Sequence, residues 1–222
     1  MRLYSEEDYR SRAEYSEPEI LRSSLASVIL RMKALGLTDV GRFPFLDPPQ
    51  PRMIADGYQL LAELGAVDEE NRLTPVGRKL ARFPIDPRIA RMILAAEREG
   101  CLAEVLVIAA VLETDDPRER PFERAEAADR AHDRYRDEQS DFTSLLKLWE
   151  RFGQMIEKRQ STRQLARELS EQFLSQRRMR EWRDVHRQLS ELVGEMSMKV
   201  NEKPATYEQL HRALIAGLLG NI

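Results

Sequence analysis

Apolar residues in the first part of the chain repeat at helical spacing. They advance in steps of three and four residues and so share one helix face: Leu21, Leu25, Val28, Met32 and Leu35. The segment Ser16-Glu17-Pro18-Glu19 has the pattern of a capping box with proline near the first turn. Gly36 tolerates the positive φ with which many helices end. We predict a helix that begins at this capping box and ends at Gly36.

A second helix is expected between Pro51 and Gly65, with one apolar face formed by Ile54, Tyr58, Leu61 and Leu64. Between the two helices, residues 39–43 are expected to form a short helical turn and residues 43–49 an extended, proline-rich loop. Phe43 and Phe45 in that loop are expected to be buried packing anchors, since burial is the ordinary role of phenylalanine.

Residues 66–87 predict a hairpin followed by two capped helix starts. Val67 and Leu73 flank the polar turn 68–71, which is typical of a short β-hairpin. Thr74-Pro75 and Asp86-Pro87 each combine a capping side chain with proline at the first helical position. Three helices and a two-stranded wing over about residues 16–83 predict a winged helix, within a domain that we place at residues 16–86.

From residue 87 onward every apolar pattern is helical. The segment Cys101–Leu112 is apolar nearly all round and is expected to be the buried central helix of a second domain, residues 87–222. Cys101 at its start is interpreted as a small buried residue. A further seam of apolar residues at helical spacing predicts one long amphipathic helix, and its members are Met179, Trp182, His186, Leu189, Val193, Met196 and Val200. The fold class is therefore mainly α: a winged helix followed by a bundle of about six or seven helices.

Composition limits the functions that the chain can have. The formal net charge is −3, so contact with nucleic acid would require a local basic patch. A single cysteine excludes an internal disulfide and fits a reducing compartment. No apolar run approaches the roughly 20 residues needed to span a bilayer, and residues 1–12 lack the apolar core of a signal peptide. We expect a cytoplasmic protein without a membrane partner.

The sequence contains no recognisable catalytic constellation. A GxxxxGK[ST] phosphate loop is absent, and no GxGxxG follows a predicted strand. The three histidines are far apart in sequence, and Cys101 has no partner at metal-ligand spacing. Acid pairs such as Asp115/Asp116 lie in charged segments without apolar surroundings that would raise a pKa. We therefore expect no catalytic, cofactor or metal site within this chain.

Clustered arginines are the main candidate for function. Arginine binds phosphate through two parallel hydrogen bonds and stacks on bases, which suits a single-stranded RNA or DNA track. The first candidates lie on the predicted long helix and are Arg177, Arg178, Arg180 and Arg183. An equally weighted alternative is that nearby acids neutralise them, namely Glu168, Glu171, Glu181 and Asp184. Arg118 and Arg120 are a second candidate group, for which neutralisation by Asp115, Asp116 and Glu119 is the favoured interpretation.

The motifs also resemble, in order, the C-terminal region of DEAH-box RNA helicases, most closely the bacterial HrpA type. The matching stretches are RLY (2–4), PEILRSSLASVILRMKALGL (18–37), FPFLDPP (43–49), LLAELGAV (60–67), LTPVGRKLARFPIDPRIARMIL (73–94), GCLAEVLVIAAVL (100–112), DPRERP (116–121), SDFTSLLKLW (140–149) and RMREWRDVHRQL (178–189). The resemblance covers nearly the whole chain. It implies that residues 1–15 are the tail of the second RecA-like domain and a linker, and that 87–222 is the ratchet-like domain, ending before an OB-fold.

This resemblance implies a non-catalytic fragment of an ATP-dependent RNA helicase. ATP and Mg would bind the RecA-like domains of the parent enzyme, and the fragment would bind no cofactor itself. Its expected partners are single-stranded RNA, with DNA as the alternative strand, and the RecA-like and OB-fold domains of the same chain. The fragment would help to form the RNA channel and couple ATP-driven domain motion to strand translocation.

Two other functions fit the residues alone. The first is a winged-helix DNA-binding regulator that dimerises through the seam at 179–200. The outward positions of the 51–64 helix include Arg52, Asp56, Gln59 and Glu63, a poor set for reading bases. The second is a protein-interaction scaffold without a nucleic-acid role.

Overall fold

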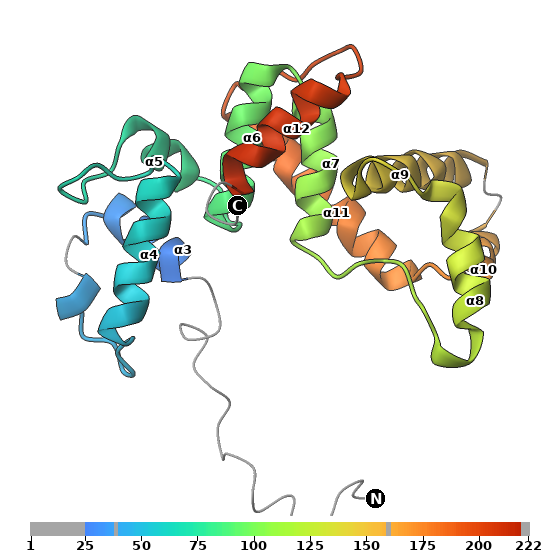
Figure 1. Ribbon diagram of the computed structural model, residues 1–222, viewed down its shortest axis with the longest axis horizontal. Helices are drawn as coiled ribbons and strands as arrows, with labels where there is room; N and C mark the ends of the chain where they lie inside the picture. The colour runs from blue at the N-terminus through green and yellow to red at the C-terminus, as the bar shows by residue number, and fades with distance from the viewer. Residues whose placement is uncertain (1–24, 38–39, 159–160, 219–222) are drawn as a thin grey trace, which may run out of the picture. The chain divides into compact units, whose positions relative to one another are not determined.

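The computed structural model describes residues 25–37, 40–158 and 161–218 (Figure 1). Contacts divide the chain after Arg82 into two units, and the boundary predicted after residue 86 lies close to this division. Regular structure in these ranges consists of helices and two isolated β-bridges, which confirms the mainly α class. The predicted tail at residues 1–15 and the capping box at residues 16–19 lie outside the described residues.

The described part of the first unit, residues 25–37 and 40–82, contains three α-helices. They are α3 (Leu25–Ala34), α4 (Pro51–Glu63) and α5 (Pro75–Leu80), with a 3-10 turn, η1, at Val40–Arg42. Helix α3 packs against both α4 and α5. Ile29 of α3, Leu61 of α4 and Leu80 of α5 are fully buried. The apolar faces read from the sequence are thus the faces that meet, because burying them against one another removes them from water.

A short hairpin joins α4 to α5. Val67 and Leu73 form an antiparallel bridge, and the turn between them is closed by the Asp68 carboxylate. That carboxylate accepts hydrogen bonds from the backbone N–H groups of Glu70 and Arg72, at 3.1 and 2.7 Å. The Thr74 hydroxyl then caps α5 by accepting from the Gly77 N–H at 3.0 Å. Three helices and this wing form the predicted winged helix.

The expectation that Phe43 is buried is wrong. Its side chain is 38% exposed, and the neighbouring Leu46 is 98% exposed. The Phe43 ring contacts the Phe45 ring, with centroids 4.7 Å apart, so the two aromatics pack mainly on each other at the surface. A proline-rich loop restricts where its side chains can reach, and local aromatic contact replaces insertion into the core.

Seven α-helices make up the described part of the second unit. These are α6 (Pro87–Glu99), α7 (Leu102–Leu112), α8 (Ala125–His132), α9 (Asp141–Lys158), α10 (Thr162–Glu171), α11 (Gln176–Glu195) and α12 (Tyr207–Leu218). Two 3-10 turns, η2 (Phe122–Arg124) and η3 (Asp133–Tyr135), flank α8. Helix α7 is the core, as predicted: α6, α9, α11 and α12 all pack against it (Figure 1). Cys101 at its start is fully buried, and burial raises the pKa of its thiol to about 11.

The predicted seam is correct in the middle of α11 and wrong at its end. Met179, Trp182, Leu189 and Val193 are buried, but α11 stops at Glu195 and Val200 is 44% exposed. Ser197 adopts a left-handed φ of 55°. The N–H of Met198 then bonds back to the Val193 carbonyl, which closes the helix end. Spacing alone did not reveal this stop, because the apolar pattern continues past it.

Helices α6 and α12 approach each other closely at Gly217. A Cβ at this position would overlap the backbone carbonyl oxygen of Arg88 and lie 2.7 Å from Cγ of Met92. The helices can therefore pack this tightly only because residue 217 has no side chain. Gly153, in the middle of α9, has open space around its Cα instead.

We predict that Gly217→Ala destabilises the second unit by about 1–3 kcal/mol, the usual effect of overpacking. Gly153→Ala is the matched control and should stabilise it by about 0.5–1 kcal/mol, because alanine has the higher helix propensity. Urea unfolding followed by circular dichroism measures both. Equal effects of the two substitutions would contradict the close approach at Gly217.

Candidate nucleic-acid interface

The structure brings the two groups of candidate arginines together. The loop that carries Arg118 and Arg120 runs beside the segment that leads into α11, and Arg118 forms an antiparallel bridge with Leu174. The Glu119 N–H donates to the Phe173 carbonyl, and the Ser175 N–H donates to the Pro117 carbonyl, both at 2.8 Å. These backbone bonds fix the loop 115–121 against the start of the arginine-bearing helix.

Arg118 and Arg120 are each held by a carboxylate. Arg118 contacts both oxygens of Asp116, with Nη2 to Oδ2 at 2.6 Å. Burial raises the pKa of Asp116, but the hydrogen bonds from Arg118 outweigh burial, so this pKa lies below its ordinary value. Arg120 forms a similar pair with Asp129 on α8, at 2.7 and 2.8 Å. Pairing with Asp116 agrees with the predicted neutralisation, whereas the partner of Arg120 was not anticipated.

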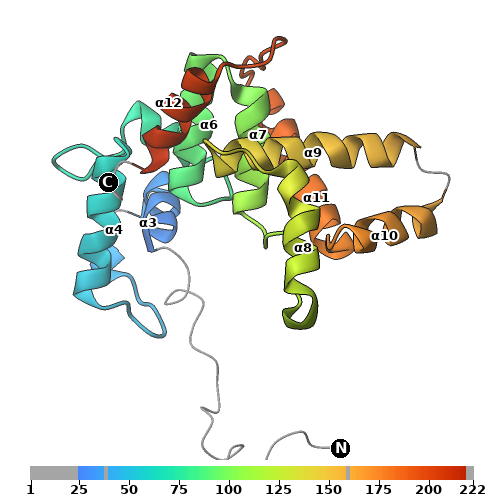
Figure 2. The same ribbon diagram turned by 45° about the vertical axis from the view of Figure 1, so that its right-hand side comes forward.

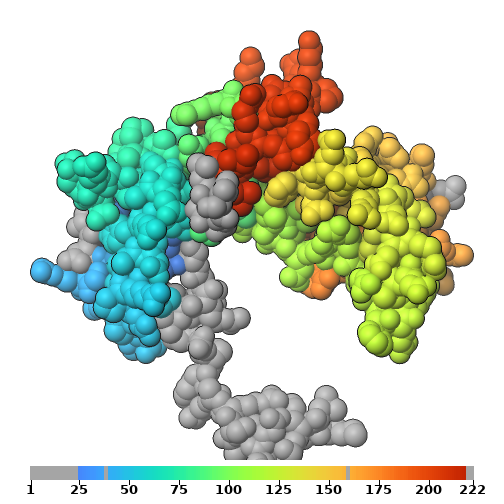
Figure 3. All heavy atoms as spheres, in the orientation of Figure 1, coloured from blue at the N-terminus to red at the C-terminus, as the bar shows by residue number. Residues whose placement is uncertain are grey.

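The pair between Arg120 and Asp129 braces a projecting part of the second unit. Figure 3 shows α8 and the turn before it standing out from the bundle, at the lower right. A polar pocket of about 670 Å³ lies beside them, and its lining includes Asp116, Arg118, Arg120, Asp129, His132, Asp133, Arg136 and Asp141. Because acids and bases are nearly balanced there, this pocket has little preference for an anion.

Arg177 and Arg178 are partly neutralised as well. Asp115 lies between them, with its Oδ2 3.8 Å from Arg177 Nη2 and 3.7 Å from Arg178 Nε. Arg177 also pairs with Glu181 one turn along α11, at 2.7 Å. Arg178 donates to the Asp116 carbonyl oxygen at 3.0 Å. These arginines therefore tie the loop 115–121 to α11.

Arg180 and Arg183 differ from the other four candidates. Both side chains are exposed, and neither has a hydrogen bond or an ion pair within residues 25–37, 40–158 and 161–218. The acids that were expected to neutralise this helix contact arginines other than Arg180 and Arg183. Glu171 pairs with Arg167, Glu181 with Arg177, Asp184 with Arg187, and Glu168 approaches Arg151 at 4.0 Å. Two adjacent guanidinium groups on one helix face thus remain available to an anionic ligand.

An aromatic cluster fixes the orientation of α11. The Trp182 indole is fully buried and donates from Nε1 to the Val107 carbonyl of α7 at 2.9 Å. The Trp149 ring lies 4.9 Å from the Trp182 ring and 4.8 Å from that of His186, measured between centroids. Trp182 and His186 thus face the bundle, whereas Arg183, the residue after Trp182, is exposed.

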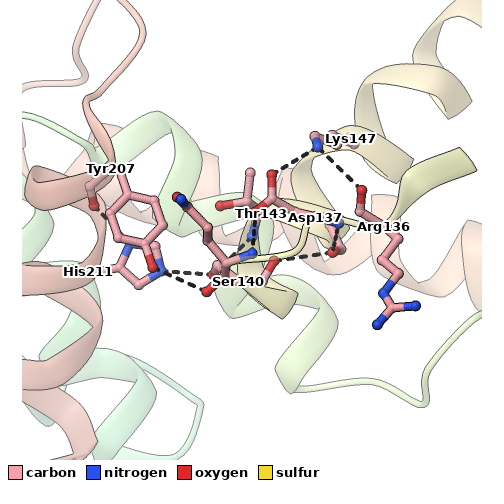
Figure 4. Close-up of polar contacts among 9 residues, drawn as sticks. Arg136, Asp137, Ser140, Thr143, Lys147, Tyr207 and His211 are labelled. Carbon is pink, nitrogen blue, oxygen red and sulfur yellow. Dashed lines mark hydrogen bonds and ion pairs between the residues drawn. The ribbon is translucent and has the colours of Figure 1, made fainter. Parts of the chain in front are cut away.

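A serine–histidine contact between α9 and α12 is a polar arrangement that the sequence did not reveal. Ser140 Oγ lies 2.8 Å from His211 Nε2, and His211 Nδ1 lies 2.8 Å from the Tyr207 carbonyl oxygen (Figure 4). That carbonyl can only accept, so Nδ1 is the donor and Nε2 accepts from Ser140 in the neutral ring. Tyr207 stacks on His211, and Ser140 is buried at the start of α9. The contact ties the two helices together, and no sequence signal links residues 71 positions apart.

Comparison with known proteins identifies the family. A model of the ratchet-like part of the helicase-associated domain, HA2, matches residues 86–192, and a model of its winged-helix part matches residues 58–85. The two matches together cover more than half of the chain. The protein therefore belongs to the helicase-associated domain (HA2) family, with a winged-helix part and a ratchet-like part.

Particular relatives are similar over the whole chain. It is 48% identical over 229 aligned residues to the ATP-dependent RNA helicase HrpA homolog of Haemophilus influenzae, and 46% identical over 227 to ATP-dependent RNA helicase HrpA of Escherichia coli. It is 33% identical over 222 residues to pre-mRNA-splicing factor ATP-dependent RNA helicase prp22 of Schizosaccharomyces pombe. All of this chain is covered in each case, but only 17–18% of the relative's length. Among the described residues, no helix is both long and apolar enough to span a membrane.

The partial burial of His186 predicts a pH-dependent stability. Burial lowers the pKa of His186, so the folded protein holds fewer protons than the unfolded chain as pH falls through the ordinary value of about 6.5. Stability should therefore decrease as pH falls below about 7.

His186→Gln should make this decrease smaller, because glutamine does not titrate. Urea unfolding of both proteins at a series of pH values measures the difference. An unchanged slope in the variant would mean that His186 does not contribute to it.

Proposed function

We propose that this chain is an accessory, non-catalytic part of an ATP-dependent DEAH-box RNA helicase and forms one wall of its single-stranded RNA channel. The observation that carries this proposal is the exposed pair Arg180 and Arg183, which has no partner among the described residues. The names of the relatives, all ATP-dependent RNA helicases, support the RNA context.

The spacing of the two arginines suits a strand of phosphates. Residues three apart share a helix face and are separated by about 4.5 Å along the axis. Long arginine side chains can therefore reach neighbouring phosphates, each through two parallel hydrogen bonds. Because these contacts involve the backbone, they would hold RNA without reading its sequence.

Helix α11 is also suited to transmit motion. It has 20 residues and so extends about 30 Å. Its middle is fixed to the core by the bond from Trp182 to Val107, which favours movement of the unit as a rigid body. ATP and Mg would act in the RecA-like domains of the parent enzyme. The RecA-like and OB-fold domains would be the intramolecular partners that move against this lever.

The DNA-binding alternative has little structural support. Arg52, Asp56, Gln59 and Glu63 on α4 are exposed, but Gln59 donates its side-chain amide to Glu63 at 3.0 Å. The seam that was the basis of the dimer hypothesis is used inside the second unit, where Met179, Trp182, Leu189 and Val193 are buried. The remaining alternative, a scaffold without a nucleic-acid role, is tested by measuring RNA binding.

We predict that the 222-residue chain binds single-stranded RNA with an affinity that falls steeply as salt rises. Arg180→Glu combined with Arg183→Glu should weaken binding at low salt at least tenfold and reduce the salt slope by about 1.4, for two lost phosphate contacts. Fluorescence anisotropy of labelled RNA over a KCl series measures both quantities.

Lys199→Glu combined with Lys203→Glu is the matched control. It makes the same change in net charge on the same unit, in the segment after α11. Binding by this control should stay close to that of the unchanged protein. If both double variants lose affinity equally, the arginine pair is not the binding site. If the unchanged chain binds no RNA at low salt, the RNA role of this chain is wrong.

The chain alone should not hydrolyse ATP, with or without RNA, because its sequence has no phosphate loop. A coupled ATPase assay on the purified chain tests this expectation. A mock preparation without the chain serves to detect a contaminating ATPase. Hydrolysis by the chain itself would overturn its assignment as a non-catalytic part.

A further inference from the structure

Arg180 and Arg183 stand at the edge of a pocket between α9, α10 and α11. Figure 2 shows α9 and α10 running alongside each other, with the start of α11 next to α10. The pocket has a volume of about 240 Å³, and its lining residues are Phe152, Thr162, Leu165, Leu169, Gln176, Arg180 and Arg183. It lies entirely within the second unit.

The lining combines an apolar floor with a polar edge. Phe152, Leu165 and Leu169 are each less than 6% exposed, so the floor is part of the packed core. Thr162 is exposed and Gln176 is half-buried at the edge. The side chains of both have no hydrogen-bond partner within the described ranges. Together they offer donors and acceptors to a ligand at the mouth of the pocket.

Size limits what the pocket can hold. Pockets for drug-sized ligands have volumes of roughly 300–1,000 Å³, so this one can accept a single ring system rather than a whole nucleotide. A charged group attached to that ring would stay outside, next to Arg180 and Arg183. The ligand therefore has a flat, partly apolar group joined to an anion.

We propose that the pocket holds one base of the bound single strand while the phosphates on either side contact Arg180 and Arg183. This inference rests on the RNA role proposed above and adds a base contact to it. The base enters the mouth of the pocket above Phe152 and the two leucines, and its edge can hydrogen-bond to Thr162 or Gln176. Every base has a flat face, so the site tolerates different sequences.

An acidic peptide with one aromatic side chain is the other ligand that this chemistry could admit. The strand is favoured because two guanidinium groups on one helix face match a repeating series of phosphates, whereas a peptide carboxylate would use only one of them. The experiment below distinguishes the two ligands.

The test compares two strands and three proteins by fluorescence anisotropy. One strand is a short oligouridylate, and the other is a ribose–phosphate oligomer of the same length without bases. The proteins are the unchanged 222-residue chain, Thr162→Trp and Thr162→Ala. Thr162 is exposed at the first position of α10, and the helix cap is Ser161, so tryptophan can fill the pocket without removing the cap.

We expect the unchanged chain to bind the oligouridylate roughly tenfold more tightly than the abasic strand, the scale of one stacked base. Thr162→Trp should lower binding of the oligouridylate to the abasic level and leave binding of the abasic strand unchanged. Thr162→Ala keeps the pocket open and should retain the preference. Circular dichroism checks that each variant is folded. The comparison of the two strands on the unchanged chain tests the proposal even if a variant does not fold.

Equal binding of the two strands by the unchanged chain would overturn the base pocket. If the double variant Arg180→Glu with Arg183→Glu still bound both strands more weakly, the proposed RNA role would stand without the base pocket. Absence of binding to either strand would overturn both. An acidic peptide with an aromatic side chain is the competitor in a last experiment. If this peptide competes with RNA, if the competition is lost in Thr162→Trp, and if the unchanged chain has no preference between the strands, the pocket is a peptide site and the proposal is overturned.

Discussion

The second unit depends on the burial of α7. This helix is apolar on nearly every side, and Leu102 and the residues from Val105 to Val111 are buried. A helix of this kind must be surrounded, because any face left in water would lose the free energy that burial contributes. Helices α6, α9, α11 and α12 provide the cover. The position of α11, and with it the direction of its arginines, follows from the requirement to enclose α7.

Within that frame, the bond from Trp182 to the Val107 carbonyl sets the rotation of α11. An indole N–H buried without a partner would cost free energy, so tryptophan is stable at this position only with its N–H directed at an acceptor. The helix period then fixes which residues face outward. Arg180 and Arg183 are exposed as a consequence of what the opposite face of the helix buries.

Charge pairing separates the arginines by function. Asp115, on a loop some 60 residues earlier in the chain, engages Arg177 and Arg178, and the Asp116 carbonyl accepts a hydrogen bond from Arg178. These contacts are partly exposed and individually weak, but together they fasten the loop to α11. Arg180 and Arg183 have no hydrogen bond or ion pair in the described part of the chain and keep their hydrogen-bonding capacity for a ligand. The same residue type thus serves a structural role in one turn of the helix and a proposed binding role in the next.

The sequence by itself determined the local structure. Spacing of apolar residues located α4, α7 and the middle of α11, and the caps Thr74 and Asp86 marked where helices begin, because these signals act over one or two turns. It did not determine the exposure of Phe43, the stop at Ser197, the contact between Ser140 and His211, or the partners of the arginines. The pocket between α9, α10 and α11 was not foreseen either. The exposure of Phe43 and the stop at Ser197 are local, but the apolar pattern around them does not reveal them. The contact between Ser140 and His211, the pairing of Arg177 and Arg178 with Asp115, and the pocket depend on groups from distant parts of the chain, and only the tertiary structure decides those distances.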